Sequence, residues 1–87
     1  MFLCEHVKIR DEKFGSVIFE TLREKVYVTN ETGKDILAFL KEGVSTEGIM
    51  ASMVNKYNED RMVVEKDVKD FIAILIKNRL VSDGHSF

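Results

Sequence analysis

The side chains best suited to chemistry in this chain are one cysteine and two histidines among 87 residues. Cys4 and His6 lie close together near the N-terminus, whereas His85 lies near the other end. A catalytic thiol needs an activating partner, and a zinc site needs three or four converging ligands. His6 is the only nearby candidate to activate Cys4, and a chance pair at a frayed terminus explains it more simply. We therefore predict neither a thiol catalyst nor a bound metal.

Two acidic pairs are of the right type for a general acid and base, but their setting argues against that role. Asp11-Glu12 and Glu59-Asp60 fall in segments predicted to be loops, where solvated carboxylates are common. The five glycines form no phosphate-binding loop, and there is no nucleophile elbow. The sequence therefore predicts a protein that is not an enzyme and that binds no cofactor.

Composition limits the remaining classes of protein. Hydrophobic residues make up 45% of the chain and charged residues 32%, as in ordinary globular proteins. A chain of this length builds one core, so we predict a single domain over residues 1–87. The 13 basic and 15 acidic residues are scattered, which disfavours nucleic acid and membranes as partners. No apolar run approaches the ~18 residues of a membrane span, so we expect a cytoplasmic protein.

Alternating β-branched and aromatic residues predict three short strands before Asn30. The first contains Val7 and Ile9, the second runs over residues 16–22, and the third over residues 25–29. Phe14-Gly15 separates the first two strands, and the polar residues 21–24 have the length of a hairpin turn. We therefore expect an antiparallel three-stranded meander.

Helical spacing replaces the alternation after Asn30, and either Asn30 or Thr32 could cap the start of the first helix. Gly43 is expected to end the first helix and Ser45 to cap the second. A polar loop over residues 58–61 leads to a third helix, taken as residues 65–79. The predicted fold class is α+β: a three-stranded antiparallel sheet followed by three helices, with a core over about residues 7–82 and frayed termini.

The third helix is apolar beyond the stripe that a core requires. On a helical wheel Val68, Ile72 and Leu75 share the core face, whereas Ile74 falls outside it. With Phe71, Ile74 would form an apolar shoulder, bordered by Asp67 and Asn78. Either a small domain wraps this helix more fully than usual, or the shoulder is one wall of a groove.

The third predicted strand offers the other wall. A meander has two edges whose backbone groups must be covered, blunted or used, and strand addition by an extended peptide is a common use. If this strand is an edge, its backbone would bind a fourth strand while the third helix contacts that strand's side chains. The alternative is an edge that is merely blunted by Lys25. The candidate peptide-binding strand comprises Lys25, Val26, Tyr27, Val28 and Thr29.

An ordered series of short motifs resembles a known family. The series is Val26 to Gly33 (VYVTNETG), Ile36-Leu37, Leu40 to Gly43 (LKEG), Ile49, Tyr57, Asp67-Val68, Phe71-Ile72, Leu75 and Leu80-Val81. Over roughly residues 7–82 it resembles the PqqD-like proteins, the RiPP recognition elements. Thr29 stands where that family usually has leucine.

The resemblance implies a winged-helix-like fold in which the third strand and third helix form a cleft. That cleft would bind the leader segment of a ribosomally synthesised precursor peptide, as a peptide chaperone does in cofactor biosynthesis and related pathways. The implied partner is a radical S-adenosylmethionine enzyme that modifies the same peptide. The iron–sulfur cluster and S-adenosylmethionine would belong to that enzyme.

Two other functions share these elements. A DNA-binding winged helix also has three helices and a hairpin, but residues 65–79 carry four basic and three acidic side chains. A wing would also follow that helix, whereas here the only predicted hairpin precedes all three helices. A dimerising module would need only the apolar shoulder of the third helix to form a homodimer.

Overall fold

The three β-branched segments near the N-terminus form the main sheet of the computed structural model, which describes residues 1–82. Strands β2 (Val7–Glu12), β3 (Gly15–Glu20) and β4 (Lys25–Asn30) are antiparallel in the order β2-β3-β4. The predicted meander is therefore confirmed. The second strand ends two residues earlier than predicted, because Leu22 belongs to the turn that leads into β4. His85 lies outside the described residues.

Polar side chains cap the first two helices, and of the two predicted candidates for the first helix Asn30 is the cap, whereas Thr32 lies within the helix. The Asn30 side chain accepts a hydrogen bond from the Gly33 amide (2.9 Å) at the start of α1 (Glu31–Lys41). Ser45 accepts one from the Gly48 amide (3.1 Å) at the start of α2 (Thr46–Tyr57). Each cap satisfies an amide that has no partner within the helix.

The third helix begins and ends earlier than predicted. Helix α3 spans Arg61–Lys77, and the side chain of its cap, Asp60, accepts a hydrogen bond from the Met62 amide (2.8 Å). Asp60 is a good helix cap, so the loop predicted over residues 58–61 ends at this residue. At the other end Arg79 adopts a left-handed conformation (φ 58°), which turns the chain away from the helix axis.

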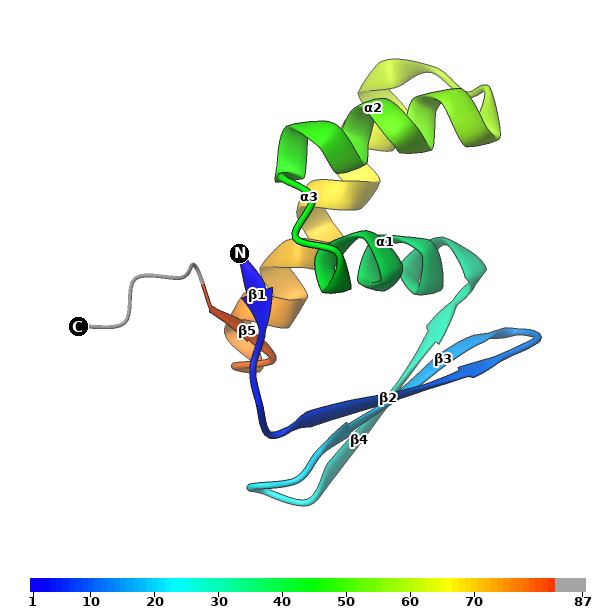
Figure 1. Ribbon diagram of the computed structural model, residues 1–87. Coiled ribbons are helices and arrows are strands. Elements are labelled where there is room, and N and C mark those ends of the chain that lie inside the picture. Colours follow the sequence, from blue (N-terminus) through cyan, green and yellow to red (C-terminus); the bar gives the residue numbers. More distant parts are fainter. Residues whose placement is uncertain (83–87) are drawn as a thin grey trace.

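All three helices lie on one side of the sheet (Figure 1). Helix α1 packs against β3 and β4, and α2 packs against α3. The core lies between these layers, and its most deeply buried aliphatic side chains are Ile18, Ile36, Leu37, Leu40, Ile49, Val68, Leu75 and Leu80. Val17 is also buried, but it is not part of this cluster. The outward face of the sheet is thus separate from the core.

A second, two-stranded sheet joins the two ends of the described chain (Figure 1). Strand β1 (Phe2–Leu3) pairs antiparallel with β5 (Val81–Ser82), and the Cys4 amide donates to the Leu80 carbonyl (3.0 Å). Strands of two residues carry no detectable period, so this pairing was not predicted. Within residues 1–82, no helix is long and apolar enough to cross a membrane.

Candidate functional site

Strand β4 is an edge of the main sheet, as the meander predicts. The hydrogen bond from the Thr21 amide to the His6 carbonyl (3.0 Å) fixes the phase of the antiparallel ladder. Bonding direction alternates from residue to residue along antiparallel strands, so the backbone of Tyr27 faces β3. The amides and carbonyls of Val26 and Val28 point the other way, to the free edge. These groups are available to an added strand.

An apolar cleft of about 520 Å³ lies between this edge and α3. Its lining consists of Val26, Tyr27, Val28 and Thr29 from β4, Phe71, Ile74 and Leu75 from α3, and Ile18, Asn30 and Leu80. Ile74 is 54% exposed, which confirms that it falls outside the core stripe of its helix. A free strand edge and an exposed apolar helix face therefore border the same space.

Three residues of the predicted site do not line this cleft. Lys25, the first residue of β4, lies opposite Glu20 in the sheet register and is not part of the cleft lining. Asp67 lines a neighbouring cavity, which also contacts Phe71. Asn78 is the C-terminal cap of α3, and its side chain donates to the Ile74 carbonyl (2.8 Å). The structure thus brings together β4 from Val26 onward with Phe71 and Ile74.

Asn78 links the two walls of the cleft instead of lining it. The Tyr27 hydroxyl and the Asn78 side-chain oxygen are 3.3 Å apart, within hydrogen-bond distance. The Arg23 guanidinium donates to the Asn78 carbonyl, which joins the β3–β4 turn to the end of α3. Two contacts from one residue therefore set the distance between β4 and α3 at this end of the cleft.

The β3–β4 turn is held by a buried carboxylate. The Glu20 side chain is fully buried and accepts hydrogen bonds from the Leu22 amide (2.9 Å), the Arg23 amide (3.0 Å) and Arg23 Nε (2.9 Å). His6 Nε2 lies 3.4 Å away. Burial alone would raise the pKa of Glu20, but the hydrogen bonds from Arg23 and the two amides outweigh it and lower the pKa below its usual value.

A second cavity of about 290 Å³ continues the cleft toward the start of α1 and shares Asn30, Phe71 and Ile74 with it. Gly33 permits this arrangement, because a Cβ there would lie 3.0 Å from the Phe71 ring and 2.8 Å from the Thr29 Cβ. Asp67 and Asp70 line the α3 side of this cavity. The combined groove is apolar in the middle and acidic at one end.

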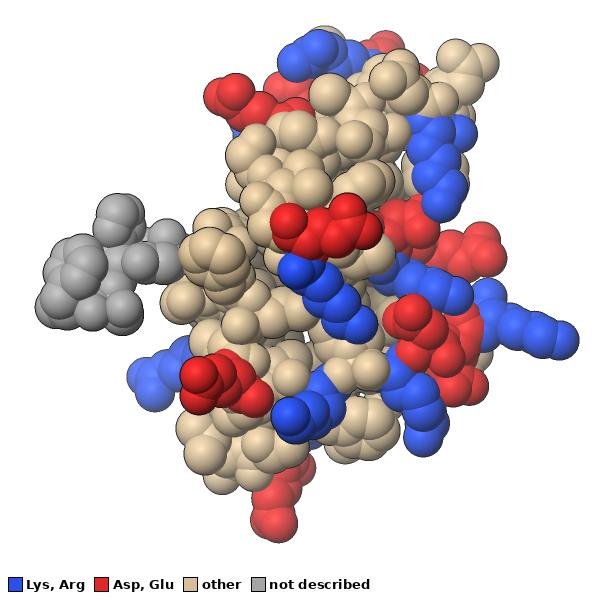
Figure 2. Space-filling view, viewed as in Figure 1, with Lys and Arg blue, Asp and Glu red and all other residues tan. Residues whose placement is uncertain are grey.

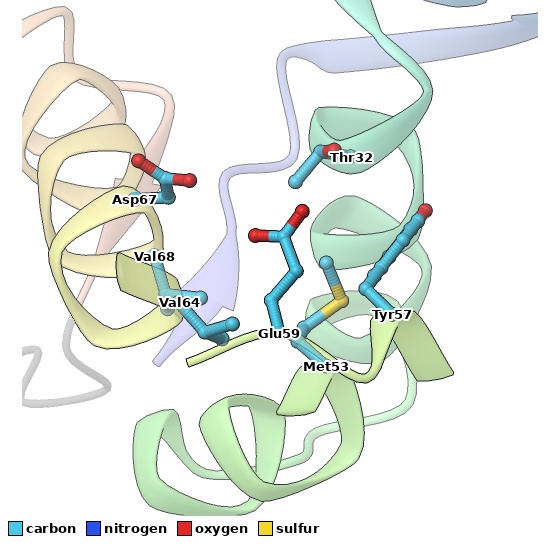
Figure 3. A pocket seen from close by; sticks show the side chains of 7 residues that line it. All are labelled: Thr32, Met53, Tyr57, Glu59, Val64, Asp67 and Val68. Carbon is cyan, nitrogen blue, oxygen red and sulfur yellow. The ribbon is translucent and has the colours of Figure 1, made fainter. Parts of the chain in front are cut away.

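A smaller pocket of about 70 Å³ lies between α1, α2 and α3 (Figure 3). Glu59 and Asp67 both border it, and the Tyr57 hydroxyl on its rim is already hydrogen-bonded to Asp35. Its volume suffices for a few water molecules only. We regard it as a gap in packing.

Charges of both signs are mixed over the surface shown in Figure 2. On α3, Arg61 pairs with Glu65 and Lys66 with Asp70, at 3.0 and 2.7 Å. Among residues 1–82, no three His, Cys, Asp or Glu side chains are placed to hold a metal ion. The apolar cleft beside β4 is thus the feature that identifies a site.

The sequence of the domain matches one family model. That model describes coenzyme PQQ synthesis protein D (PqqD), and the match covers residues 15–81. The chain belongs to the PqqD family. The resemblance found in its motifs is thereby confirmed. No curated protein matches the chain.

Two solved structures share the fold of this PqqD-family protein. TbiB1, solved in complex with the TbiA(beta) leader peptide, superposes with a TM-score of 0.88 at 24% identity, and the match covers 100% of both chains. Lasso peptide synthetase B1, complexed with the leader peptide, gives a TM-score of 0.78 at 20% identity, covering 87% of this chain and 89% of that one. The helices and the sheet are therefore arranged as in both proteins.

Sequence reasoning missed several residues of this groove. Leu80 lines the cleft because the left-handed Arg79 turns the chain back, and no periodicity signals that turn. Ile18 lies on the central strand β3, opposite Tyr27, and also lines the cleft. Gly33 shapes the second cavity by lacking a side chain. Asn30 could have been found, because it directly follows the predicted strand and caps the next helix.

Proposed function

We propose that this protein binds an extended leader segment of a ribosomally synthesised precursor peptide by adding it as a fourth strand to β4. The observation that carries the proposal is the open edge of β4 beside an apolar cleft. Main-chain hydrogen bonds to Val26 and Val28 would supply most of the register, and Phe71 and Ile74 would supply selectivity. Asp67 would border the acidic end of the groove.

Two comparisons support the proposal. TbiB1 and lasso peptide synthetase B1, which share this fold, were both solved with a leader peptide. Membership of the PqqD family, whose model describes coenzyme PQQ synthesis protein D, also supports a role in a biosynthetic pathway of this kind.

The protein would act as an adaptor and not as a catalyst. By holding the leader, it would raise the local concentration of the precursor at a separate enzyme. We propose a radical S-adenosylmethionine enzyme for that role, acting in the cytoplasm. The iron–sulfur cluster and S-adenosylmethionine would be bound by that enzyme.

Binding is tested with synthetic peptides tiled across the leader segments of candidate precursor peptides encoded near this gene. We expect one segment to bind with a Kd of about 1 μM or lower, which corresponds to about −8 kcal/mol. Isothermal calorimetry measures it directly. If no tile binds at high micromolar concentration, the proposal is wrong.

The adaptor role needs a separate test. Turnover of the precursor by the enzyme is measured with and without this protein, using a precursor that lacks its leader as the control. We expect faster turnover of the intact precursor only. Equal turnover in all reactions would contradict the adaptor role even if the leader binds.

Binding to duplex DNA distinguishes the proposed adaptor from a DNA-binding winged helix. Two of the four basic side chains of α3, Arg61 and Lys66, are ion-paired with carboxylates, so duplex DNA should bind weakly and be released by moderate salt. Fluorescence anisotropy with labelled duplexes measures this. Tight, sequence-selective binding would favour a DNA-binding regulator.

A further inference from the structure

The outward face of the main sheet, which the helices do not cover, is apolar next to the free edge. The strand segment that holds Val26 and Val28 borders the cleft, but alternation along β4 directs their side chains to this outward face, because Tyr27 between them lies opposite the buried Ile18. Val26 and Val28 are 59% and 68% exposed. In the sheet register Val26 lies opposite Phe19 and Val28 opposite Val17. Side chains on paired positions share a face, so these four residues lie side by side on the outward face. Val26 and Val28 are its exposed part, Phe19 is half-buried and Val17 is buried beneath them. We call these four residues the outer patch.

The outer patch ends before it reaches the opposite edge of the sheet. Continuing the same two rows across the sheet, Phe19 lies opposite Lys8 and Val17 opposite Arg10 on β2. The Arg10 guanidinium lies over the Phe19 ring, 5.6 Å from its centroid. Cationic side chains therefore cover the β2 side, and the exposed apolar area is confined to the side of β4.

Strand geometry determines what would cover this area. The backbone groups of Val26 and Val28 face the free edge, so an antiparallel strand added there forms its hydrogen-bonded pairs with these two residues. The peptide side chains opposite them fall on the outward face, directly beside the outer patch. The side chains between them point to the other face, into the cleft beside Phe71 and Ile74.

We propose that a bound strand is recognised on both faces, through the cleft and through the outer patch. This rests on the proposed function and specifies its ligand. The peptide segment would be a continuous apolar run of about five residues, because both sets of alternating side chains meet apolar surface. If the protein contacted only one face of the bound strand, it would instead select apolar residues at alternate positions of the peptide.

A second copy of this chain is the other occupant that the geometry allows. Exposed apolar edge strands pair readily with one another, so β4 of two copies would cover both patches. The peptide fits better, because the cleft beside α3 has room for side chains that an edge-to-edge dimer does not supply. Sedimentation of the free protein distinguishes the two occupants.

The experiment uses an mRNA-displayed library of random twelve-residue peptides, selected on the full chain without reference to any precursor. Three proteins are compared: wild type, the double variant Val26→Thr and Val28→Thr, and the control Val63→Thr. Threonine keeps the shape and strand preference of valine while adding a hydroxyl, and the two edge valines are exposed, so the fold should persist. Val63 is an exposed valine on α3 that lines neither the cleft nor the second cavity.

We expect wild type and the control to enrich a contiguous apolar run. The double variant should keep the preference at cleft-facing positions and lose it at outward positions, with five- to tenfold weaker binding of the selected peptides by calorimetry. If wild type enriches apolar residues at alternate positions only, the bound strand contacts one face of the sheet. That result would overturn recognition through the outer patch but would still agree with strand addition to β4. Enrichment of no peptide at all would contradict the proposed function itself. A free protein that is dimeric as wild type and monomeric as the double variant would overturn the inference in favour of a second copy.

Discussion

The two edge strands of the main sheet differ sharply in side-chain chemistry. Strand β2 carries four charged residues among its six, Lys8, Arg10, Asp11 and Glu12. Strand β4 has the same length and carries one, Lys25. Charged side chains are a common means of preventing an edge from pairing with another chain. The contrast shows that one edge is protected and that the other is left open.

The two edges also differ in their surroundings. Beside β4 lies the apolar cleft, whose width is set by Asn78 and by the turn that Glu20 holds. The Arg10 side chain on β2 instead pairs with Glu12 at 3.0 Å and lies over the Phe19 ring. Only the β4 edge thus combines free backbone groups with a cleft that can hold the side chains of a bound peptide.

The largest effect is expected from Val28→Pro, because proline has no backbone N–H and so removes one hydrogen-bond donor from the open edge of β4. The Val28 amide faces away from β3, so proline removes no bond of the existing sheet and the fold should persist. Loss of the donor leaves a peptide carbonyl unpaired, so leader binding should weaken about a hundredfold, or about 2.7 kcal/mol.

Circular dichroism and calorimetry on the same sample check this prediction. Tyr27→Pro serves as the contrast, because the Tyr27 backbone faces β3 and its loss should destabilise the sheet itself. A folded Val28→Pro variant that binds normally would show that the peptide uses another surface.

The next effect concerns the helix wall of the cleft. Ile74→Asp places an unpaired charge where an apolar peptide side chain should lie, which costs about 2 kcal/mol or roughly thirtyfold in affinity. Because Ile74 is 54% exposed, the unfolding free energy should change by less than about 0.5 kcal/mol. Ile76→Asp is a matched control, since Ile76 is 53% exposed on the same helix and does not line the cleft. Unfolding of the Ile74 variant would show that Ile74 belongs to the core.

Removing the protection of β2 provides a smaller and opposite test. The double variant Lys8→Val and Arg10→Val gives β2 the apolar character of β4. We expect concentration-dependent self-association by sedimentation, with no gain in leader affinity, because the cleft lies beside β4 and not beside β2. Improved leader binding through the changed strand would mean that an apolar edge suffices without the cleft.

The smallest effect is expected from acid. The folded-state pKa of Glu20 is lowered, so its ionised form adds stability above the unfolded-state pKa, and that contribution is lost as pH falls through the folded value. Arg23 is ion-paired with Glu20, His6 Nε2 lies 3.4 Å from its carboxylate, and Lys25 lies opposite it in the sheet register. Urea unfolding at pH 7 and at about pH 3 measures the loss. Glu20→Gln should be less stable at pH 7 and show a smaller change between the two pH values. An equal pH dependence in both proteins would assign the effect to other carboxylates.

Most of the fold could be predicted because local signals agree with the final arrangement. Alternation gave the three strands, and caps at Asn30 and Ser45 gave two helix starts. The start of α3 was predicted wrongly because the Asp60 cap lies in a polar segment that also suits a loop. The pairing of Phe2–Leu3 with Val81–Ser82 was not predicted, since it depends on contact between distant ends of the chain.

The candidate site was only partly predictable. Val26, Val28 and Ile74 were identifiable because they are apolar at positions that the core does not require. Leu80 was not, because its place in the cleft depends on the chain reversal at Arg79. Ile18 was not, because it lies on the central strand and reaches the cleft only through the packing of the sheet. Asn78 was expected at the edge of the site, but it is a link between the two walls.

By itself, the sequence determined which segments form strands and helices and which apolar side chains are surplus to a core. Those properties depend on the period of side chains along one element, which is local. Tertiary structure alone decided that the surplus on β4 and the surplus on α3 border one cleft. That juxtaposition depends on the packing of α3 beside the sheet and on the contacts of Asn78 with Tyr27 and Arg23, which join residues 51 and 55 positions apart.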